Sequence, residues 1–224
     1  MHQAQEKNKA KWNFQIIPEP PAEDEIREEW HCDAVVAGAG LGGLSAACHL
    51  KELGINVILI EKSASYSGRG GHFGVADSAL MEENGIKNDP AELARQWIAM
   101  SGNNVDQELV WLFLNRSREA MDWLIPKTIA ANLQPRLVDC RYPSAPYKEF
   151  FGAHSFIPRG NIRGSHVSRS LYEDAVQQGV EIHFNTAAMQ LIQDKNGNIT
   201  GLYAHSPKGL VRIHADRGVV LATG

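Results

Sequence analysis

The sequence predicts an α/β fold with three layers, in which helices cover one face of a parallel sheet and an antiparallel β-meander covers the other. Two apolar runs of strand length, Ala34 to Ala37 and Asn56 to Ile60, flank a glycine-rich turn and an Ala/Leu-rich helical stretch that ends at Gly54. Strand, helix and strand in this order form a βαβ unit with parallel strands. Three short β-like runs near the end of the chain, joined by turns at residues 196–197 and 207–209, predict the meander.

Composition and charge exclude several classes of protein. The chain has 224 residues, of which 43% are hydrophobic and 21% are charged, as in ordinary globular domains. The net charge of −4 provides no basic field that would attract a nucleic-acid backbone, so we expect no nucleic-acid partner. No stretch approaches the roughly 18 consecutive apolar residues of a membrane-spanning helix, so no integral membrane segment is predicted. The first 30 residues lack a signal-peptide pattern, which favours a cytoplasmic location and leaves an exported mature form open.

Residues 1–30 are predicted to form a solvated, mobile leader, and residues 31–224 are predicted to form the folded domain. The leader contains seven acidic and four basic residues, three prolines and almost no periodic apolar pattern. Such a segment buries too little apolar surface to offset the entropy lost on ordering it.

Two helices are predicted in the middle of the chain. Asp89 and Pro90 are typical of a capped first helical turn, and Asp106 is predicted to cap a second helix that ends at Pro126. Residues 126–164 are rich in proline, glycine, arginine and aromatic residues and show no clear period. They are therefore predicted to form a long functional or covering loop.

The last third of the chain returns to regular elements. Apolar residues from Val167 to Val176 predict a third helix, which Gly179 ends, and Val180 to Phe184 predicts another strand of the parallel sheet. The meander runs are Met189 to Gln193, Ile199 to Ala204 and Leu210 to Ala215. A final run, Gly218 to Leu221, is predicted to be a buried strand that leads into a turn of small residues.

The glycine-rich turn has the spacing of a Rossmann-like dinucleotide-binding fingerprint. Gly38, Gly40 and Gly43 follow a predicted strand and open a helix, and Glu61 stands at the end of the next strand. The first glycine allows a tight turn, the second lets a pyrophosphate approach the backbone, and the third lets the helix pack on its strand. The helix N-terminus offers free N–H groups to the phosphates. The Glu61 carboxylate is predicted to accept hydrogen bonds from a ribose, which disfavours the 2′-phosphate of NADP but does not distinguish NAD from FAD.

From Asp33 to Gly224 the sequence resembles the N-terminal half of the FAD-dependent fumarate reductase, succinate dehydrogenase and ketosteroid dehydrogenase flavoproteins. The resemblance rests on several motifs in the same order. They are the glycine fingerprint, Glu61-Lys62, Gly70-Gly71-His72-Phe73, Asn185-Thr186-Ala187-Ala188, and Val220-Leu221-Ala222-Thr223-Gly224. Several ordered motifs are more specific than one fingerprint alone.

This resemblance implies that FAD is the cofactor. In the family the glycine pair lies along the pyrophosphate and flavin, the backbone at Ala188 lies at the adenine, and the Ala-Thr-Gly turn closes over the cofactor. The chain is slightly longer than many relatives between Lys62 and Gly70, so Arg69 or Gly70 are alternative contacts to Gly71 or His72. The Ser-His-Thr context of covalent attachment is absent around His72, which favours noncovalent binding. The cofactor positions that the resemblance assigns are Gly38, Ala39, Gly40, Leu41, Gly42, Gly43, Glu61, Lys62, Arg69, Gly70, Gly71, His72, Phe73, Ala188, Ala222, Thr223 and Gly224.

The resemblance also implies an oxidoreductase of the fumarate-reductase type, in which a hydride passes between flavin and an activated C=C bond of a small carboxylate or enone substrate. In the family, the chain continues beyond the Ala-Thr-Gly turn into a cap domain that holds the substrate. That cap is absent here, so we expect a domain truncated at this turn and assign no catalytic residue. Electrons are expected from an external donor or a second polypeptide. Two alternatives stay open: a noncatalytic FAD-binding fragment or subunit that needs a second polypeptide, and an NAD-linked dehydrogenase.

The other chemically capable side chains favour structural roles. A group of basic residues near the third helix is predicted to be a solvated surface rather than an anion site. Its members are His154, Arg159, Arg163, His166 and Arg169. The lone histidines His183, His205 and His214 lack metal-ligand spacing and are predicted to be core or surface residues. The widely spaced cysteines Cys32, Cys48 and Cys140 are predicted to be inert, buried thiols.

Overall fold

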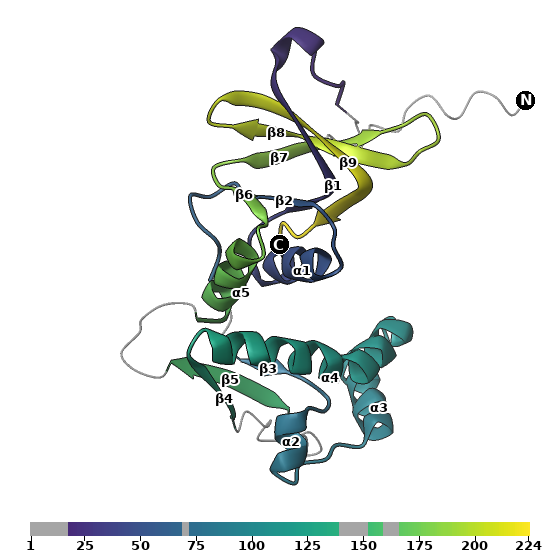
Figure 1. Ribbon diagram of the computed structural model, residues 1–224. Coiled ribbons are helices and arrows are strands. Elements are labelled where there is room, and N and C mark those ends of the chain that lie inside the picture. The colour runs from purple at the N-terminus through teal and green to yellow at the C-terminus, as the bar shows by residue number, and fades with distance from the viewer. Residues whose placement is uncertain (1–17, 69–71, 139–151, 159–165) are drawn as a thin grey trace, which may run out of the picture.

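The computed structural model describes residues 18–68, 72–138, 152–158 and 166–224 of the chain. These residues form an upper and a lower region that share one hydrophobic core (Figure 1). In chain order, the upper region contains the 3-10 turn η2 (Glu23–Glu25), β1 (Ile26–Ala37), α1 (Leu41–Glu52), β2 (Val57–Ile60), α5 (His166–Gln177), β6 (Glu181–His183), β7 (Ala187–Gln193), β8 (Ile199–Ser206) and β9 (Gly209–Leu221). The lower region contains β3 (Phe73–Gly74), α2 (Ala79–Glu83), α3 (Pro90–Met100), α4 (Gln107–Ala130), β4 (Leu133–Leu137) and β5 (Ala153–Pro158).

The upper region is built on one sheet with the strand order β6-β2-β1-β9-β8-β7. The first four strands are parallel: Ala34 of β1 is paired with Val57 of β2 and with Gly218 of β9, and Ile58 of β2 is paired with Glu181 of β6. Strands β7 and β8 continue the sheet in antiparallel order as the predicted meander. The βαβ unit of β1, α1 and β2 is therefore confirmed.

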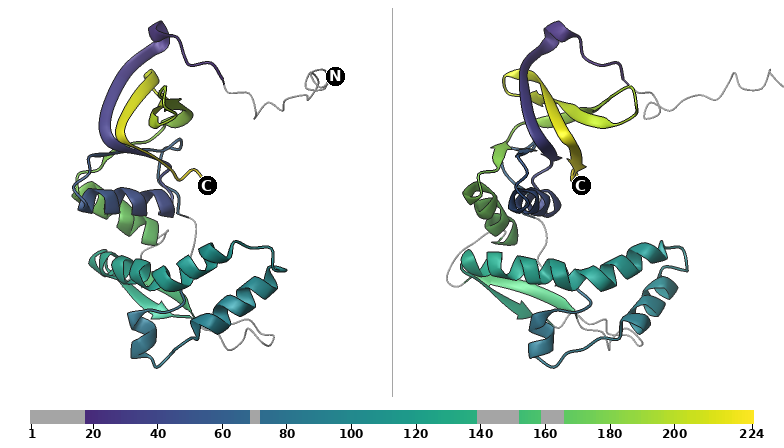
Figure 2. Two further views of the ribbon diagram at one scale, coloured as in Figure 1. Left: turned by 90° about the vertical axis from the view of Figure 1, so that its right-hand side faces the viewer. Right: turned by 45° about the vertical axis from the view of Figure 1, so that its right-hand side comes forward.

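Alternate residues of the parallel strands pack into two different cores. Val36 of β1 packs with Leu44 of α1 and Leu171 of α5. Its neighbour Val35 packs in a second cluster with Ile213 of β9. Because successive side chains of a strand point to opposite faces, this alternation places the parallel sheet between a helical layer and the meander. The structure confirms the predicted three-layer α/β fold, and Figure 2 shows β1 and β9 curving away from the helices.

Strand β1 is much longer than the sequence indicated. It begins at Ile26 rather than Ala34, so residues 26–30 belong to the sheet and not to the predicted leader. The charged side chains of Arg27 and Glu29 are exposed on a strand whose backbone pairs with β9, which is why the apolar pattern gave no signal there. Residues 1–17 of the predicted leader lie outside the described residues.

The runs Leu210 to Ala215 and Gly218 to Leu221 form the single strand β9 and not two strands. The pairing with β1 shifts register between Cys32 and Ala34. On both sides of this shift β9 pairs in parallel with β1, and residues 209–214 of β9 also pair with β8 in the meander. The last run is not buried as predicted: Leu221 is 60% exposed. Within the described part of the chain, residues 218–221 pair with β1 on one edge and with no strand on the other.

In the lower region, α4 runs through Pro126 to Ala130 instead of ending at the proline. A proline removes one helical N–H donor, a loss that packing on both sides can offset. Leu124 and Thr128, which flank the proline, are both buried. The N-caps were predicted correctly, because Asp89 and Asp106 each accept hydrogen bonds from two backbone N–H groups of the following turn.

The predicted loop over residues 126–164 contains regular structure. Besides the end of α4, it includes β4 and β5, which form a three-stranded sheet with β3 in the order β3-β5-β4. Pro135 lies within β4, where a proline weakens the strand signal in the sequence. Residues 139–151 and 159–164 of the predicted loop lie outside the described residues.

Lys127 connects the two regions electrostatically. Its Nζ donates hydrogen bonds to Asp174 of α5 at 2.8 Å and to Glu52 of α1 at 2.5 Å. The Lys127 side chain is only 13% exposed. Burial lowers the pKa of the ammonium, but the two carboxylates outweigh it and hold the pKa above its ordinary value. A charged Lys127 therefore links α4 to both helices of the upper region.

Candidate functional site

The glycine turn after β1 packs so closely that two of its residues have no room for a side chain. At Gly38, φ is +111° and an added Cβ would lie 2.2 Å from the carbonyl oxygen of Ala222. At Gly43, an added Cβ would lie 1.8 Å from the carbonyl oxygen of Gly38. The turn is held by hydrogen bonds from the Gly38 amide to the Ile60 carbonyl and from the Ala222 amide to the Ala37 carbonyl, both 2.8 Å long. The first and third glycines are thus required for packing.

Gly40 and Gly42 have the opposite environment, because no atom lies within 4 Å of a Cβ added at either position. Gly40 is the N-cap of α1 and offers no side-chain acceptor to the first helical turn. The N-caps of α2, α3 and α4, which are Ser78, Asp89 and Asp106, all accept such hydrogen bonds. The first N–H groups of a helix have no partner within the helix and carry a partial positive charge. The start of α1 therefore leaves space and donors for an anion.

Glu61 is buried at the carboxyl end of β2, immediately beside this turn. Its Oε2 accepts a hydrogen bond from the Ala39 amide and its Oε1 accepts one from the Ser63 amide, both at 2.8 Å. Burial raises the pKa of a carboxyl, but these amides, together with the nearby Lys62, hold the pKa of Glu61 below its ordinary value. The ionised carboxylate retains lone pairs for further donors, such as the hydroxyls of a ligand.

A cavity of about 210 Å³ opens beside Glu61, where the carboxyl ends of the parallel strands meet. Its lining residues are Ala37, Gly38, Ile60, Glu61, Lys62, Thr186, Ala187, Ala188 and Thr223. The structure thus brings together five residues that the sequence assigned to the cofactor: Gly38, Glu61, Lys62, Ala188 and Thr223. In open α/β sheets, ligands bind outside the carboxyl ends of the strands, and this cavity lies at that position.

Thr186 and Ala187 line the same cavity but were not assigned to the site. The Thr186 amide donates a hydrogen bond of 2.8 Å to the backbone carbonyl of Glu61, which holds the start of β7 against the end of β2. Both residues belong to the Asn-Thr-Ala-Ala motif that led to Ala188, so the signal was present in the sequence. The sequence could not show the backbone hydrogen bond between Thr186 and Glu61, which brings the whole motif to the cavity.

The remaining predicted residues occupy different places. Ala39 is fully buried, with its N–H bound to Glu61 and its carbonyl accepting a hydrogen bond from the Ser67 amide at 3.0 Å. Leu41 and Phe73 line a separate apolar cavity of about 530 Å³ between α1 and α4. His72 and Gly224 are exposed, and Ala222 packs against Gly38. Arg69, Gly70 and Gly71 lie outside the described residues.

Of the five residues of the predicted basic surface, the structure describes the side chains of His154 and Arg169, and His154 does not belong to such a surface. His154 is fully buried in β5, where its Nε2 lies 2.8 Å from the Ser78 hydroxyl and its Nδ1 lies 3.1 Å from the Gly152 carbonyl. Burial lowers the pKa of His154, so this histidine is a neutral structural residue. Arg169 is exposed on α5 and pairs with Glu173 at 2.7 Å. Arg159 and Arg163 lie outside the described residues, as does the side chain of His166.

The described cysteines are inert, as predicted. Cys32 and Cys48 are free and buried. Burial raises the pKa of the Cys32 thiol to about 11 and that of the Cys48 thiol to about 12, so neither forms a thiolate at neutral pH. Cys140 lies outside the described residues.

One family model covers the glycine turn, the Glu61 cavity and the meander together. Residues 33–224 match the model of the FAD binding domain. The chain belongs to this family. FAD is therefore the cofactor of the domain, which confirms the choice between FAD and NAD that the fingerprint left open.

Curated relatives agree with the predicted resemblance. The chain is 31% identical over 202 residues to urocanate reductase of Eggerthella lenta, a match covering 86% of this chain and 31% of that protein. It is 28% identical over 198 residues to fumarate reductase (cytochrome) of Shewanella frigidimarina, covering 86% of this chain and 33% of that protein. The chain thus spans about a third of the length of these relatives.

Solved structures share the fold. The 3-ketosteroid-Δ4-(5α)-dehydrogenase from Rhodococcus jostii RHA1 superimposes with a TM-score of 0.72 at 22% identity, over 88% of this chain and 47% of that one. A flavocytochrome c3 fumarate reductase in its open conformation gives a TM-score of 0.71 at 22% identity, over 87% of this chain and 34% of that one. Among the helices that the structure describes, none combines the length and apolarity needed to cross a lipid bilayer.

Proposed function

We propose that this chain is the FAD-binding part of an oxidoreductase that passes a hydride between a noncovalently held flavin and an activated C=C bond of a small carboxylate or enone. The observation that carries the proposal is the open N-terminus of α1 next to the Glu61 cavity. Nothing lies within 4 Å of a Cβ added at Gly40, and the Glu61 carboxylate lies beside the same turn, where it accepts a hydrogen bond from the Ala39 amide at 2.8 Å.

The described residues offer groups that would hold each part of an FAD molecule. The uncapped N–H groups at the start of α1 would hold the diphosphate, and the absence of a Cβ at Gly40 would let it approach the backbone. Glu61 would accept hydrogen bonds from the ribose hydroxyls, the backbone at Ala188 would lie at the adenine, and Thr223 would belong to the turn that closes over the cofactor; all three residues line the same cavity. When bound, FAD supplies the hydride chemistry, and the protein orients and tunes it.

The substrate class is supported by the relatives rather than by a described pocket. Fumarate and urocanate, the substrates in the names of two relatives, each contain a C=C bond conjugated to a carboxylate. Other relatives are named 3-oxosteroid 1-dehydrogenases, and a 3-oxosteroid whose ring double bond is conjugated with the ketone is an enone. An electron-poor C=C bond is the feature that these compounds share, so we propose such a substrate and an external electron donor, in the cytoplasm.

A second candidate follows from the length comparison. Because the chain spans about a third of its curated relatives, it is also consistent with a noncatalytic FAD-binding fragment or subunit that requires a second polypeptide to complete a substrate site. The two candidates differ in one observable property. The fragment retains FAD but does not reoxidise reduced flavin with an alkene acceptor.

The test begins with the absorption spectrum of the purified chain. Oxidised flavin bands, with release of all the flavin on acid precipitation, would support noncovalent FAD; flavin that stays in the pellet would refute noncovalent attachment. The chain is then reduced with dithionite under anaerobic conditions and mixed separately with fumarate, urocanate and an enone. Reoxidation supports the oxidoreductase, whereas bound flavin that stays reduced with all three supports the fragment. A colourless chain that binds NAD would overturn the proposal.

A further inference from the structure

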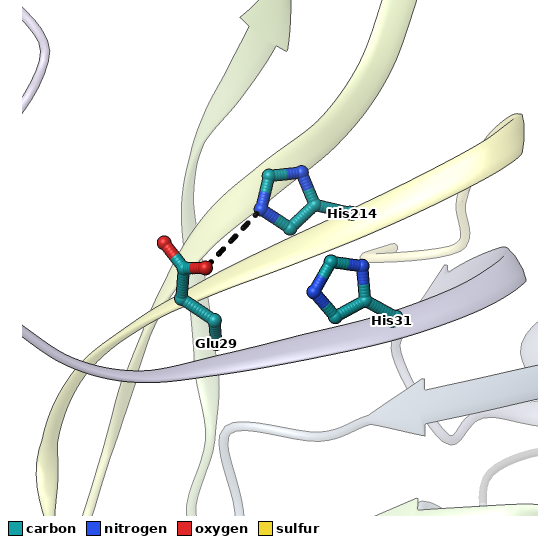
Figure 3. Close-up of side chains that lie close together, drawn as sticks. All are labelled: Glu29, His31 and His214. Carbon is teal, nitrogen blue, oxygen red and sulfur yellow. Dashed lines mark ion pairs between the residues drawn. The ribbon is translucent and has the colours of Figure 1, made fainter.

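Three metal-binding side chains lie together on β1 and β9, away from the glycine turn. They are Glu29, His31 and His214, and Figure 3 shows them gathered above the two strands. His31 and His214 are direct partners in the parallel pairing of β1 and β9. Glu29 precedes His31 by two residues, so both side chains leave the same face of β1. The group is at the beginning of β1, whereas the glycine turn follows its end.

The ligand atoms of the three side chains lie close enough together for a small divalent cation to reach all of them. The imidazole rings of His31 and His214 are nearly parallel, with centroids 4.6 Å apart and an interplanar angle of 12°. The Nε2 of His214 lies 3.9 Å from Oε2 of Glu29, and one ligand atom from each residue lies within 4.8 Å of the others. Zinc bonds of about 2.0–2.1 Å in a tetrahedral site place ligand atoms roughly 3.3 Å apart. The ligand atoms would therefore have to approach one another by up to about 1.5 Å, and the stacked imidazole rings would have to turn so that each directs a ring nitrogen at the ion.

The surroundings orient the carboxylate. Arg212 is the residue paired with Glu29 across the strands, and its Nη1 donates a hydrogen bond of 2.7 Å to Oε1 of Glu29. This hydrogen bond occupies Oε1 of Glu29, so Oε2 is the carboxylate oxygen that faces His214. The positive charge of Arg212 is shared with Glu23, which accepts a hydrogen bond from Nη2. Outer hydrogen bonds of this kind fix the orientation of metal-ligating side chains.

We propose that Glu29, His31 and His214 bind one Zn²⁺ ion, which links β1 to β9 and keeps an open coordination position for water. Two imidazoles and one carboxylate form a ligand set that Zn²⁺ accepts, with water as a fourth ligand. The site is distinct from the cofactor cavity, and it does not depend on the proposed oxidoreductase activity. Sequence spacing could not indicate it, because His31 and His214 meet only through strand pairing.

The first test is a calorimetric titration of the metal-free full chain with Zn²⁺. We expect one saturable equivalent. Loss of an outer hydrogen-bond partner of a metal ligand costs about 10- to 100-fold in affinity, so loss of a ligand should cost no less. Both His31→Ala and His214→Ala should therefore bind at least about tenfold more weakly. The matched control is His205→Ala, which removes an exposed histidine of β8 outside the group and should leave the affinity unchanged.

The second test identifies the ligands by a signature that a folding defect cannot imitate. Bound Cu²⁺ should show electron paramagnetic resonance couplings to two imidazole nitrogens in the parent chain and to one in His31→Ala or His214→Ala. Circular dichroism of the variants verifies that the fold is kept. The proposal is overturned if no one-equivalent Zn²⁺ binding is found, if the two variants bind as tightly as the parent, or if the nitrogen couplings are the same in all of them.

Discussion

Gly43→Ala tests whether the third glycine of the turn is a packing requirement. The added Cβ would lie 1.8 Å from the Gly38 carbonyl oxygen and 3.3 Å from the Ala222 Cβ. Since the first contact must lengthen to about 3.0 Å, α1 and the turn must separate by about 1.2 Å. The obstructing atom is backbone, and the turn around it is held by two hydrogen bonds of 2.8 Å, so it cannot rotate away. Overpacking costs about 1–3 kcal/mol, and we expect the upper end of this range here.

Urea unfolding of the parent and variant measures this effect, with and without added FAD. A loss of about 3 kcal/mol corresponds to a fall in Tm of about 6–12 °C for a chain of this size. Gly42→Ala is the matched control: the residue is adjacent, helical and exposed, and nothing lies within 4 Å of the added Cβ. The free energy of unfolding of Gly42→Ala should rise by up to about 1 kcal/mol, because alanine has a higher helix propensity than glycine. A Gly43→Ala variant as stable as Gly42→Ala would refute the packing argument.

Three further predictions address the cofactor site and the link between the regions. Gly40→Val should lower the free energy of unfolding by at most about 1 kcal/mol, because the added side chain meets open space. The same variant should nevertheless lose its FAD. The flavin-to-protein ratio after gel filtration measures this loss, and a normal ratio would contradict the diphosphate site. Glu61→Gln should cost about 1.5–3 kcal/mol at pH 7 by losing charged hydrogen bonds. The pKa of Glu61 is lowered in the folded state, so its carboxylate contributes to the free energy of unfolding at pH values above its ordinary pKa of about 4.3. This contribution is lost as the pH falls through the folded pKa. The unfolding curves of the parent and the variant should therefore converge in acid. Lys127→Met should lower the free energy of unfolding by about 3 kcal/mol, because it leaves Glu52 and Asp174 without their cation. The control Arg116→Ala removes an exposed ion pair on the same helix and should lower it by less than about 1 kcal/mol. Equal changes in Tm would show that burial does not strengthen the Lys127 link.

Local patterns predicted the elements whose signals are short-range. The βαβ unit, the caps at Asp89 and Asp106 and the third helix each depend on residues within a few positions of one another, and each is present. The glycine fingerprint also belongs to this group. Its prediction extended to the spatial neighbour Glu61, because strand, helix and strand in this order place the ends of adjacent parallel strands side by side.

The errors occur where a neighbour distant in the sequence overrides the local pattern. The polar first half of β1 is a strand because β9 supplies its hydrogen bonds, and α4 continues through Pro126 because the flanking turns are buried. His154, a member of the predicted basic surface, is neutral and buried because β5 places it against Ser78. In each case the deciding contact joins residues that no periodicity connects.

The amino-acid sequence by itself determined the class of fold, the glycine turn, the acidic residue that faces it and the choice of FAD through several motifs in order. The first three of these features follow from backbone freedom, apolar period and residue order along the chain, whereas the choice of FAD follows from the resemblance of the ordered motifs to a known family. Only the tertiary structure decided which residues join the Glu61 cavity, how the two regions are linked through Lys127, and that His31 meets His214. Those relations depend on strand register and on the packing of distant segments, and a linear pattern does not encode the register of β1 against β9.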